Sequence, residues 1–380
     1  MFRLIQRLKR DFSISIVSLN APPLNEEQNK QAAKTLQDMG VECNLVPFDS
    51  SFKPHLKDPL PQAFKSLQSN RMSLLLNKLL SPGNFDLLQL EYSASGQWIR
   101  SLPRVPVALT LHQLEYLASF RAAMASAKFS ARLLGILDTL KALSAEKQSM
   151  LKADVLISPT PSEARLCRLI SGKPAVVAPM AADPVQSERG KRDFDIVFHG
   201  NFSHPANQDA AKILLDQVLP AVRLQRPGTS MGLLGTFMGQ ALKKKAYHAG
   251  ISPLGRVSDL HGMLLKARIF VAPLFLGGGM RGKILDALSA GLPVVTTPLG
   301  AEGISDQSTT SSKTGTNFDT PVLVVKDKEQ FAQKILCLLD DPAILGRLSK
   351  EARSLAGHFR WDKTARVYSA MYLGLLKQNY

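Results

Sequence analysis

The chain has 380 residues, of which 45% are hydrophobic and 21% are charged. One hydrophobic core stops growing at roughly 250–300 residues, so this length predicts two domains, and the composition excludes a disordered chain. The formal net charge is +16, from 47 Lys and Arg against 31 Asp and Glu. Such a charge predicts anionic partners, and nucleic acid, an acidic membrane surface and phosphorylated substrates all stay open.

Cysteine content and hydropathy indicate the class of protein. Cys43, Cys167 and Cys337 are far apart and have no metal-ligand spacing, so the sequence supports neither a disulfide framework nor a zinc site. A reducing cytoplasm is the expected setting. No apolar run reaches the ~20 residues of a membrane span. Basic and apolar residues alternate over 1–10, which predicts a short amphipathic helix rather than a signal peptide.

Apolar segments of strand length alternate with helix-length segments almost to the C-terminus, a pattern typical of parallel sheets covered by helices. In the first half we predict strands at 13–19, 41–48, 85–90, 105–110, 153–157 and 174–178, and a long helix over about 113–147. In the second half we predict strands at 194–198, 229–234, 251–254, 268–272, 292–296 and 321–325. The fold class is therefore α/β, with two Rossmann-like doubly wound domains.

The domain boundaries follow from a change in composition. Apolar content drops over 183–192, where Pro, Gly and charged residues collect, so we expect domains at 1–183 and 193–358. No strand follows the last predicted helix, 361–380, and we expect it to pack back on the first domain. Ligands of open parallel sheets bind beyond the carboxyl ends of the strands, so we expect the site in a cleft between the domains.

The most informative segment joins a buried strand, a glycine loop at 277–279 and a helix predicted over about 280–290. Glycines let backbone N–H groups approach an anion, and the helix N-terminus adds the positive end of its dipole. Arg281 and Lys283 in the first turn oppose that dipole, which favours a bound anion there. Asp286, one turn further, could accept both hydroxyls of a ribose, or could be an ordinary surface acid. The segment predicts a diphosphate cradle.

This segment and five others resemble the GT-B glycosyltransferases of family 4, also called glycosyltransferases group 1. In the second half the resemblance is carried by FHGNFSHPANQDA at 198–210, GRVSDL at 255–260 and TTPLGAEG at 296–303. In the first half, FDLLQLEYS at 85–93 and LTLHQLEY at 109–116 are similar to the strand ends of the family's acceptor domain. The resemblance covers essentially the whole chain and implies the GT-B architecture, with the donor bound by the second domain.

The resemblance also implies an activity: a sugar is transferred from a nucleotide-diphosphate sugar, with retention of anomeric configuration and without a metal or other cofactor, to a glycan, a lipid-linked or another cell-envelope acceptor. The residues implied as catalytic are His112, Arg281 and Lys283. Those implied as donor-binding are Gly200, Asn201, Arg256, Val257, Gly277, Gly278, Gly279, Met280 and Asp286, with Arg256 and Val257 at the base. Glu91 and Glu115 are implied on the acceptor side. Fixed cations such as Arg281 and Lys283 would stabilise the departing diphosphate.

Two departures from the family pattern concern the donor side. The family usually has two glutamates seven residues apart, and here Gly278 and Asp286 stand at those positions. The Arg and Lys often found after the first strand of the second domain have no counterpart, and Asn201 and Asn207 lie nearby instead. An alternative interpretation is therefore a catalytically impaired relative that serves as a binding or partner subunit.

A third departure concerns the N-terminus. Family members usually begin with a strand and a glycine-bearing loop before a helix that resembles FRLIQRLKR. We expect 13–19 to correspond to the family's second strand, with the first strand missing. The competing interpretation makes 13–19 the first strand, preceded by an added helix.

The excess positive charge favours a membrane over nucleic acid. The chain has no basic run with interleaved aromatic residues, and aromatic residues make up only 7% of it. Each Lys or Arg near an anionic lipid surface contributes about 1 kcal/mol, so a cytoplasmic protein bound peripherally to the inner face of the membrane fits better. The helix at 2–10 could contribute to this contact, or could pack on the first sheet.

Overall fold

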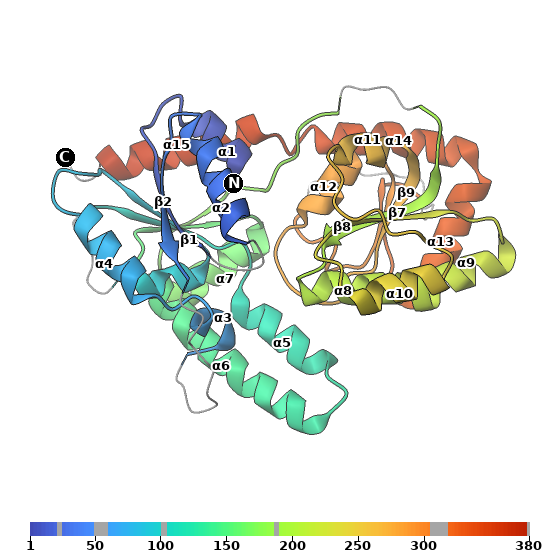
Figure 1. Ribbon diagram of the computed structural model, residues 1–380, viewed down its shortest axis with the longest axis horizontal. Coiled ribbons are helices and arrows are strands. Elements are labelled where there is room, and N and C mark those ends of the chain that lie inside the picture. Colours follow the sequence, from blue (N-terminus) through green and yellow to red (C-terminus); the bar gives the residue numbers. More distant parts are fainter. Residues whose placement is uncertain (21–24, 49–59, 100–104, 186–189, 305–317, 378–380) are drawn as a thin grey trace. The chain divides into compact units, whose positions relative to one another are not determined.

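The computed structural model describes residues 1–20, 25–48, 60–99, 105–185, 190–304 and 318–377 (Figure 1). The chain divides into two compact units, Met1–Pro179 with Trp361–Tyr380, and Met180–Arg360. The hinge expected at 183–192 falls inside the second unit, and its residues 186–189 lie outside the described part. Each unit has its own hydrophobic core and is described below by itself.

The described part of the first unit contains six parallel strands in two sheets. One sheet pairs β1 (Ser15–Asn20) with β2 (Glu42–Pro47), and the other has the order β3 (Leu88–Glu91), β4 (Val107–Thr110), β5 (Val155–Ser158) and β6 (Ala175–Val177). All six predicted strands are present, but the prediction of one doubly wound sheet did not anticipate this division. Within the described residues, β1 and β3 each pair on one side only, whereas β4 and β5 are buried throughout.

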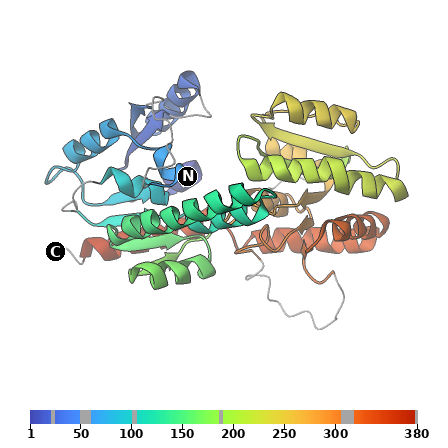
Figure 2. The same ribbon diagram turned by 90° about the horizontal axis from the view of Figure 1, so that it is seen from below.

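The helices of the first unit cover these sheets. They are α1 (Phe2–Leu8), α2 (Glu26–Gln37), α3 (Gln62–Lys65), α4 (Asn70–Leu79), the 3₁₀ helix η1 (Ser93–Trp98), α5 (Glu115–Ala125), α6 (Phe129–Leu151), α7 (Pro161–Ser171) and α15 (Trp361–Lys377). The C-terminal helix α15, red in Figures 1 and 2, lies beside the four-stranded sheet. The Tyr368 hydroxyl lies 3.1 Å from that of Thr110 on β4, and the Tyr372 hydroxyl donates to Gln89 on β3 at 3.2 Å.

The N-terminal helix α1 packs within its own unit. Leu4, Ile5 and Leu8 are buried, and α1 contacts α15. Arg7 forms an ion pair with Asp362 at 2.7 Å. The apolar face predicted for this segment is therefore used for intramolecular packing, and the alternative of a membrane contact is not needed to explain it.

The single helix predicted over 113–147 is wrong, because the chain turns back between α5 and α6. Ser126 and Lys128 have extended backbones, and the two helices form a hairpin (Figure 1). The turn contains neither proline nor glycine, so the sequence carries no breaker signal. Packing determines the break: a Cβ added to Gly135 would lie 2.6 Å from the Cβ of Ala123, so the helix backbones approach closely here.

The residues described for the second unit form one five-stranded parallel sheet. Its order is β11 (Val322–Val324), β10 (Val294–Thr296), β9 (Ala267–Ala272), β7 (Phe194–Asn201) and β8 (Met231–Thr236). Its helices are α8 (Pro205–Ile213), the π-helix η2 (Leu214–Val218), α9 (Leu219–Gln225), α10 (Gln240–His248), α11 (Leu260–Leu265), α12 (Gly282–Ser289), α13 (Lys328–Asp340) and α14 (Pro342–Ala356). β7 has β8 on one side and β9 on the other, so the strand order reverses there, where open sheets bind ligands.

The strand predicted over 251–254 is wrong. The described chain has only an isolated bridge between Gly255 and Leu234 at this place. Pro253 lacks an N–H donor, and Gly255 adopts a left-handed φ of +61°, which ends the extended segment. The other five strands predicted for this unit are present, with boundaries shifted by a few residues.

The close contact in the α5–α6 hairpin leads to a prediction about stability. Replacing an interior helical glycine with alanine normally stabilises a protein by about 0.5–1 kcal/mol. Gly135→Ala should instead lower the free energy of unfolding by about 1 kcal/mol, because its Cβ meets Ala123. Both tryptophans, Trp98 and Trp361, lie in the first unit, so urea unfolding followed by tryptophan fluorescence reports on this unit alone.

Gly374→Ala in α15 of the same unit is the matched control. A Cβ added there meets nothing within 4 Å, so this variant should be unchanged or slightly stabilised. Equal effects of the two substitutions would contradict close packing in the hairpin.

Candidate functional site

A pocket of about 470 Å³ lies at the carboxyl ends of β7 and β8. Its lining residues come from four separate segments of the second unit: His199, Gly200, Asn201, Asn207, Leu234, Gly235, Thr236, Gly255, Arg256, Val257, Leu260 and Lys283. Five of the residues implied by the family resemblance are among them, namely Gly200, Asn201, Arg256, Val257 and Lys283. The position beyond the strand ends is the one where parallel sheets bind ligands.

Two glycines let the backbones at the end of β7 and β8 come together. Gly235 has a φ of +146°, and a Cβ at this position would lie 1.9 Å from the carbonyl oxygen of Gly200. A Cβ on Gly200 would lie 3.0 Å from the side-chain Cγ of Asn207. Larger residues would push β7 and β8 apart or displace Asn207, so both glycines are needed for the shape of the pocket.

Lys283 supplies a cation from the first turn of α12. Its ammonium donates a hydrogen bond to the side-chain oxygen of Asn207, a neutral partner, and lies 5.1 Å from the ring centroid of Phe198. Burial lowers the pKa of Lys283 to about 7; nearby Arg281 acts in the same direction, and Asp286 in the opposite direction. An anion bound in the pocket would favour the charged form of this side chain.

The glycine loop before α12 has a less regular course than the sequence suggested. Gly277 and Gly279 have left-handed φ values of +92° and +73°. α12 begins at Gly282, two residues later than predicted, so Arg281 caps the helix instead of lying in its first turn. The Arg281 guanidinium turns back toward the loop and donates to the carbonyl of Leu276 at 3.3 Å.

The loop residues are close to the pocket in sequence but do not line it. Gly278 and Met280 are buried, and a Cβ on Gly277 would meet the Arg281 guanidinium at 3.2 Å. None of the residues from Gly277 to Arg281 belongs to the lining of the 470 Å³ pocket, and neither does Asp286. Lys283 therefore lines the pocket together with the strand-end residues, whereas the loop residues from Gly277 to Arg281 do not.

Asp286 lies beside two histidines that the sequence analysis missed. Its Oδ2 is 4.0 Å from Nε2 of His199, and burial raises the pKa of Asp286 to about 6, although nearby His261 lowers it. Burial and Lys283 lower the pKa of His199 to about 3, so this ring is neutral. Nε2 of His261 is buried without a hydrogen-bond partner. A signal for His199 was available, since a polar residue directly follows the strand predicted over 194–198. The short helix α11 gave none for His261.

In the first unit, Glu91 and His112 meet at the carboxyl ends of β3 and β4. Nε2 of His112 lies 2.7 Å from Oε2 of Glu91, and the other carboxylate oxygen accepts a hydrogen bond from Gln89 at 3.3 Å. The Tyr92 ring lies 4.4 Å from the His112 ring, centroid to centroid. Tyr92 has a φ of +69°, rare for a bulky residue and typical of constrained functional segments. The imidazole is thus fixed from two sides.

Glu115 begins α5 and has a different environment. Its carboxylate accepts a hydrogen bond from Gln113 at 3.0 Å, and burial raises its pKa. The backbone N–H groups of Glu115 and Tyr116 donate to the carboxylate of Glu146, each at 2.9 Å. Burial raises the pKa of Glu146 to about 7. Glu146, which the sequence analysis missed, therefore satisfies the first N–H groups of α5 and fixes its start.

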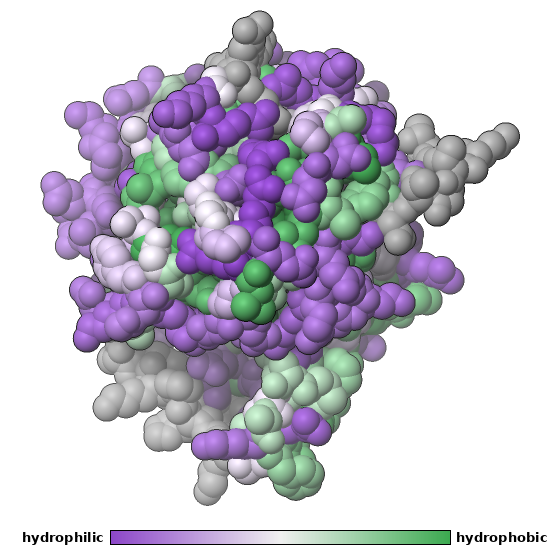
Figure 3. Space-filling model, turned by 90° about the vertical axis from the view of Figure 1, so that its right-hand side faces the viewer, coloured by the Kyte–Doolittle hydropathy of each residue, from purple (hydrophilic) through white to green (hydrophobic). Residues whose placement is uncertain are grey.

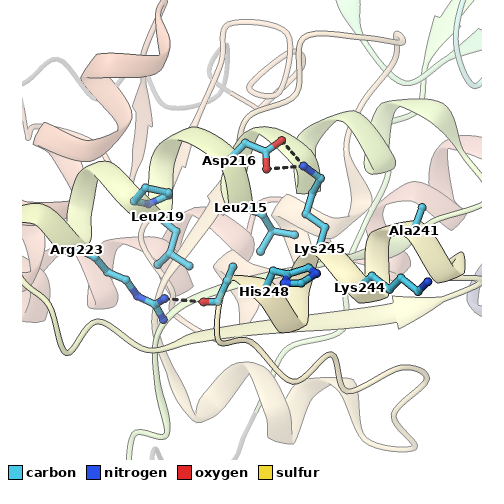
Figure 4. Close-up of a pocket in the computed structure, with 10 residues that line it drawn as sticks. Leu215, Asp216, Leu219, Arg223, Ala241, Lys244, Lys245 and His248 are labelled. Atoms are coloured by element: carbon cyan, nitrogen blue, oxygen red, sulfur yellow. Dashed lines mark hydrogen bonds and ion pairs between the residues drawn. The ribbon is translucent and has the colours of Figure 1, made fainter.

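A larger pocket, of about 660 Å³, lies between helices of the second unit (Figure 4). Two of its cations already have partners: Lys245 binds Asp216 at 2.6 Å, and Arg223 donates to the carbonyl of Ala249 at 2.6 Å. All of the residues that line it come from η2, α9, α10 and the residue after α10, and none from a strand end. The strand-end pocket is therefore the better candidate, although it is smaller.

Among the described residues, no group of three or more His, Cys, Asp or Glu side chains could hold a metal ion. No helix in the described part of the chain is long and apolar enough to cross a membrane.

Comparison with known families finds a similarity for most of the second unit. Residues 193–341 match the profile of the family "Glycosyl transferases group 1". This part of the chain is therefore similar to the group 1 glycosyltransferases. The match spans β7 to the end of α13 and so includes the strand-end pocket and the whole of α12. No curated protein matches the sequence.

Similarity to solved structures shows that the chain has the GT-B fold. Anabaena Alr3699/HepE, in complex with UDP and glucose, has a TM-score of 0.66 at 13% identity over 97% of this chain and 94% of its own. Staphylococcus aureus TarM has a TM-score of 0.61 at 11% identity, and pneumococcal O-GlcNAc transferase GtfA one of 0.56 at 12%. The matches cover 79% and 80% of this chain, but only 58% and 59% of TarM and GtfA. The GT-B resemblance inferred from the sequence is confirmed.

The lowered pKa of Lys283 leads to a prediction about pH. A nucleoside diphosphate should bind more weakly as pH rises from about 6 to about 8.5, because Lys283 loses its proton over this range; its Kd should increase by about tenfold. Isothermal titration calorimetry at several pH values measures this.

Lys283→Arg is the control, since arginine stays charged throughout this range. Its Kd should vary less with pH, while the titration of the nucleotide itself is common to both proteins. Parallel pH profiles for the two proteins would rule out Lys283 as the titrating group.

Proposed function

We propose that the protein is a retaining glycosyltransferase that uses a nucleotide-diphosphate sugar, with uridine diphosphate as the leaving nucleotide. The observation that carries this proposal is Lys283, a cation with a lowered pKa in a pocket at the strand ends of a group 1 glycosyltransferase domain. The choice of uridine diphosphate rests on HepE and TarM, whose structures hold UDP.

The reaction requires that charge be stabilised on the leaving group. The bond between the anomeric carbon and the diphosphate oxygen breaks, a bond from the acceptor oxygen to that carbon forms on the same face, and the acceptor loses a proton. The diphosphate departs with additional negative charge. Lys283 and the N–H groups at the start of α12 can stabilise that charge without a metal, with Arg281 at the cap adding long-range attraction.

The remaining donor contacts follow from the lining of the pocket. The backbone at Arg256 and Val257 would hold the base, and Gly200 and Asn201 the phosphate side. Asp286 would face the ribose, with His199 next to its carboxylate. Gly277, Gly278, Gly279 and Met280 would shape the loop before α12, without lining the pocket themselves.

In the first unit we assign His112 to the reacting sugar or the acceptor, and Glu91 to the acceptor side and to the orientation of His112. The carboxylate of Glu91 fixes the tautomer and direction of the imidazole, as in a base–orienter pair. Glu115, with its raised pKa, is the second acceptor-side acid. We propose a glycan, a lipid-linked or another cell-envelope acceptor, and activity at the inner face of the membrane.

The alternative is an impaired transferase that binds a donor or a partner without turnover. Gly278 and Asp286, which stand where the family has two glutamates, are the features that favour it. A donor panel distinguishes the two: nucleotide-sugar binding with neither transfer nor hydrolysis would support the partner subunit, whereas turnover of a UDP-sugar would support the enzyme.

Substitution of the cations tests the proposed donor site. Lys283→Ala should lower kcat/KM by about 100-fold, because a charge aimed at the leaving group is lost. Arg281→Ala should have a smaller effect, about tenfold, because this guanidinium turns toward the glycine loop. Lys245→Ala, which removes a cation of the 660 Å³ pocket, is the control and should leave kcat/KM within about twofold. Loss of activity in Lys245→Ala with retention in Lys283→Ala would place the donor in the other pocket.

Glu91 can be tested as a positioning residue. Glu91→Gln keeps the size of the side chain but removes its charge, so kcat should fall by about tenfold while KM stays within about twofold, because His112 loses the carboxylate that orients its ring. Glu42→Gln, an exposed acid on β2, is the control. A lower thermal stability with an unchanged kcat would mean that Glu91 has only a structural role.

A further inference from the structure

Large apolar side chains are exposed along the α5–α6 hairpin. On α6, Phe129 is 80% exposed, Leu133 51% and Leu140 60%. Leu134 and Leu137 on the same helix are also exposed, as are Phe120 and Met124 on α5. In Figure 3 the lower projection, which is this hairpin, carries many green apolar side chains. A cluster of exposed apolar residues of this size indicates an interaction surface.

The exposed residues of α6 follow one face of the helix. Phe129, Leu133, Leu137 and Leu140 are spaced by four, four and three residues, which places them in a single stripe. Gly135, close to Ala123 of α5, lies on a different side, as do the buried residues Thr139 and Ala142. The stripe is therefore separate from the surface that holds the hairpin together.

The charged residues of the hairpin between Tyr116 and Leu137 are all basic. From Tyr116 to Leu137 the sequence contains Arg121, Lys128 and Arg132 and no acidic residue. The next acid, Asp138, accepts a hydrogen bond from the backbone of Gln62 at 3.2 Å, so it is directed at α3 and away from the stripe. The tip of the hairpin thus combines exposed apolar side chains with positive charge.

We propose that the α5–α6 hairpin docks the protein on an anionic lipid bilayer, with the apolar stripe at the level of the headgroups. The combination of an apolar face with basic residues is typical of helices that lie in a membrane interface. A second copy of this chain is a poorer partner for the hairpin, because two hairpin tips would bring like charges together and repel each other. Acidic lipid headgroups instead neutralise these charges. The chain as a whole, at +16, is attracted to the same surface.

In this proposal the membrane contact is made by the α5–α6 hairpin and not by α1, because the apolar residues of α1 are buried against α15. It also separates membrane docking from sugar transfer, since the stripe contains none of the residues assigned to the donor or the acceptor. A protein that fails to transfer sugar could still bind lipid through this hairpin, and the two proposals are tested independently.

Vesicle co-sedimentation tests the proposal with the full chain. The wild type should bind vesicles that contain about 30% phosphatidylglycerol in phosphatidylcholine, and should bind pure phosphatidylcholine vesicles at least about tenfold more weakly. The double substitution Phe129→Ser with Leu133→Ser should weaken partitioning by about tenfold or more, as should Lys128→Glu with Arg132→Glu. Circular dichroism checks that the variants keep their helices.

Matched controls use equally exposed residues outside the hairpin. Leu169→Ser with Leu224→Ser removes two apolar side chains that are 72% and 86% exposed, and Lys350→Glu with Lys363→Glu makes the same change of charge. Both controls should leave apolar-driven binding intact, with at most a small loss from the altered net charge. Three results would overturn the proposal: no preference for anionic vesicles, unchanged binding by the hairpin variants, or a wild-type dimer that the hairpin variants convert to a monomer.

Discussion

The second unit is organised around one interaction, the placement of the Lys283 cation in the first turn of α12 against a neutral amide. Placing a charge in a desolvated position is costly unless an opposite charge compensates it, and its hydrogen-bond partner Asn207 brings none. A ligand that carries negative charge therefore stabilises the charged form of Lys283 most. The strand order, the glycines of β7 and β8 and the course of the loop before α12 all serve to hold this ammonium beside an open space.

The groups around Lys283 leave its ammonium able to bind an anionic ligand. Asp286 lies one helical turn away, with its carboxylate near the neutral ring of His199 at 4.0 Å, while the Lys283 ammonium binds Asn207. The raised pKa of Asp286 and the lowered pKa of Lys283 have the same first cause, desolvation. A closer ion pair between them would have stabilised both charges and removed the attraction for a diphosphate.

Much of the fold could be predicted from sequence because buried parallel strands are continuous apolar runs, and eleven of the twelve predicted strands are present. The failures have local causes: Pro253 and Gly255 end an extended segment, and the break between α5 and α6 depends on the contact of Gly135 with Ala123. The division of the first unit into two sheets is a matter of tertiary pairing, which periodicity does not report.

The candidate site could be predicted in part for a similar reason. Strand ends and glycine loops are visible in sequence, so Gly200, Arg256 and Lys283 could be assigned to one place. The partners of these residues could not: the bond from Lys283 to Asn207, the approach of His199 to Asp286 and the reversal of Arg281 toward Leu276 depend on side-chain directions. The pair of Glu91 and His112 could be predicted in part. Both residues lie at the ends of predicted strands, but only the fold brings their side chains within 2.7 Å of each other.

A crystal structure of the protein with a nucleoside diphosphate tests the central claim most directly. We expect a diphosphate within hydrogen-bond distance of Nζ of Lys283 and of the N–H groups at the start of α12, with the base against Arg256 and Val257. A nucleotide bound instead in the 660 Å³ pocket beside Lys245 and Arg223, or density that leaves Lys283 on Asn207 without a phosphate, would contradict it.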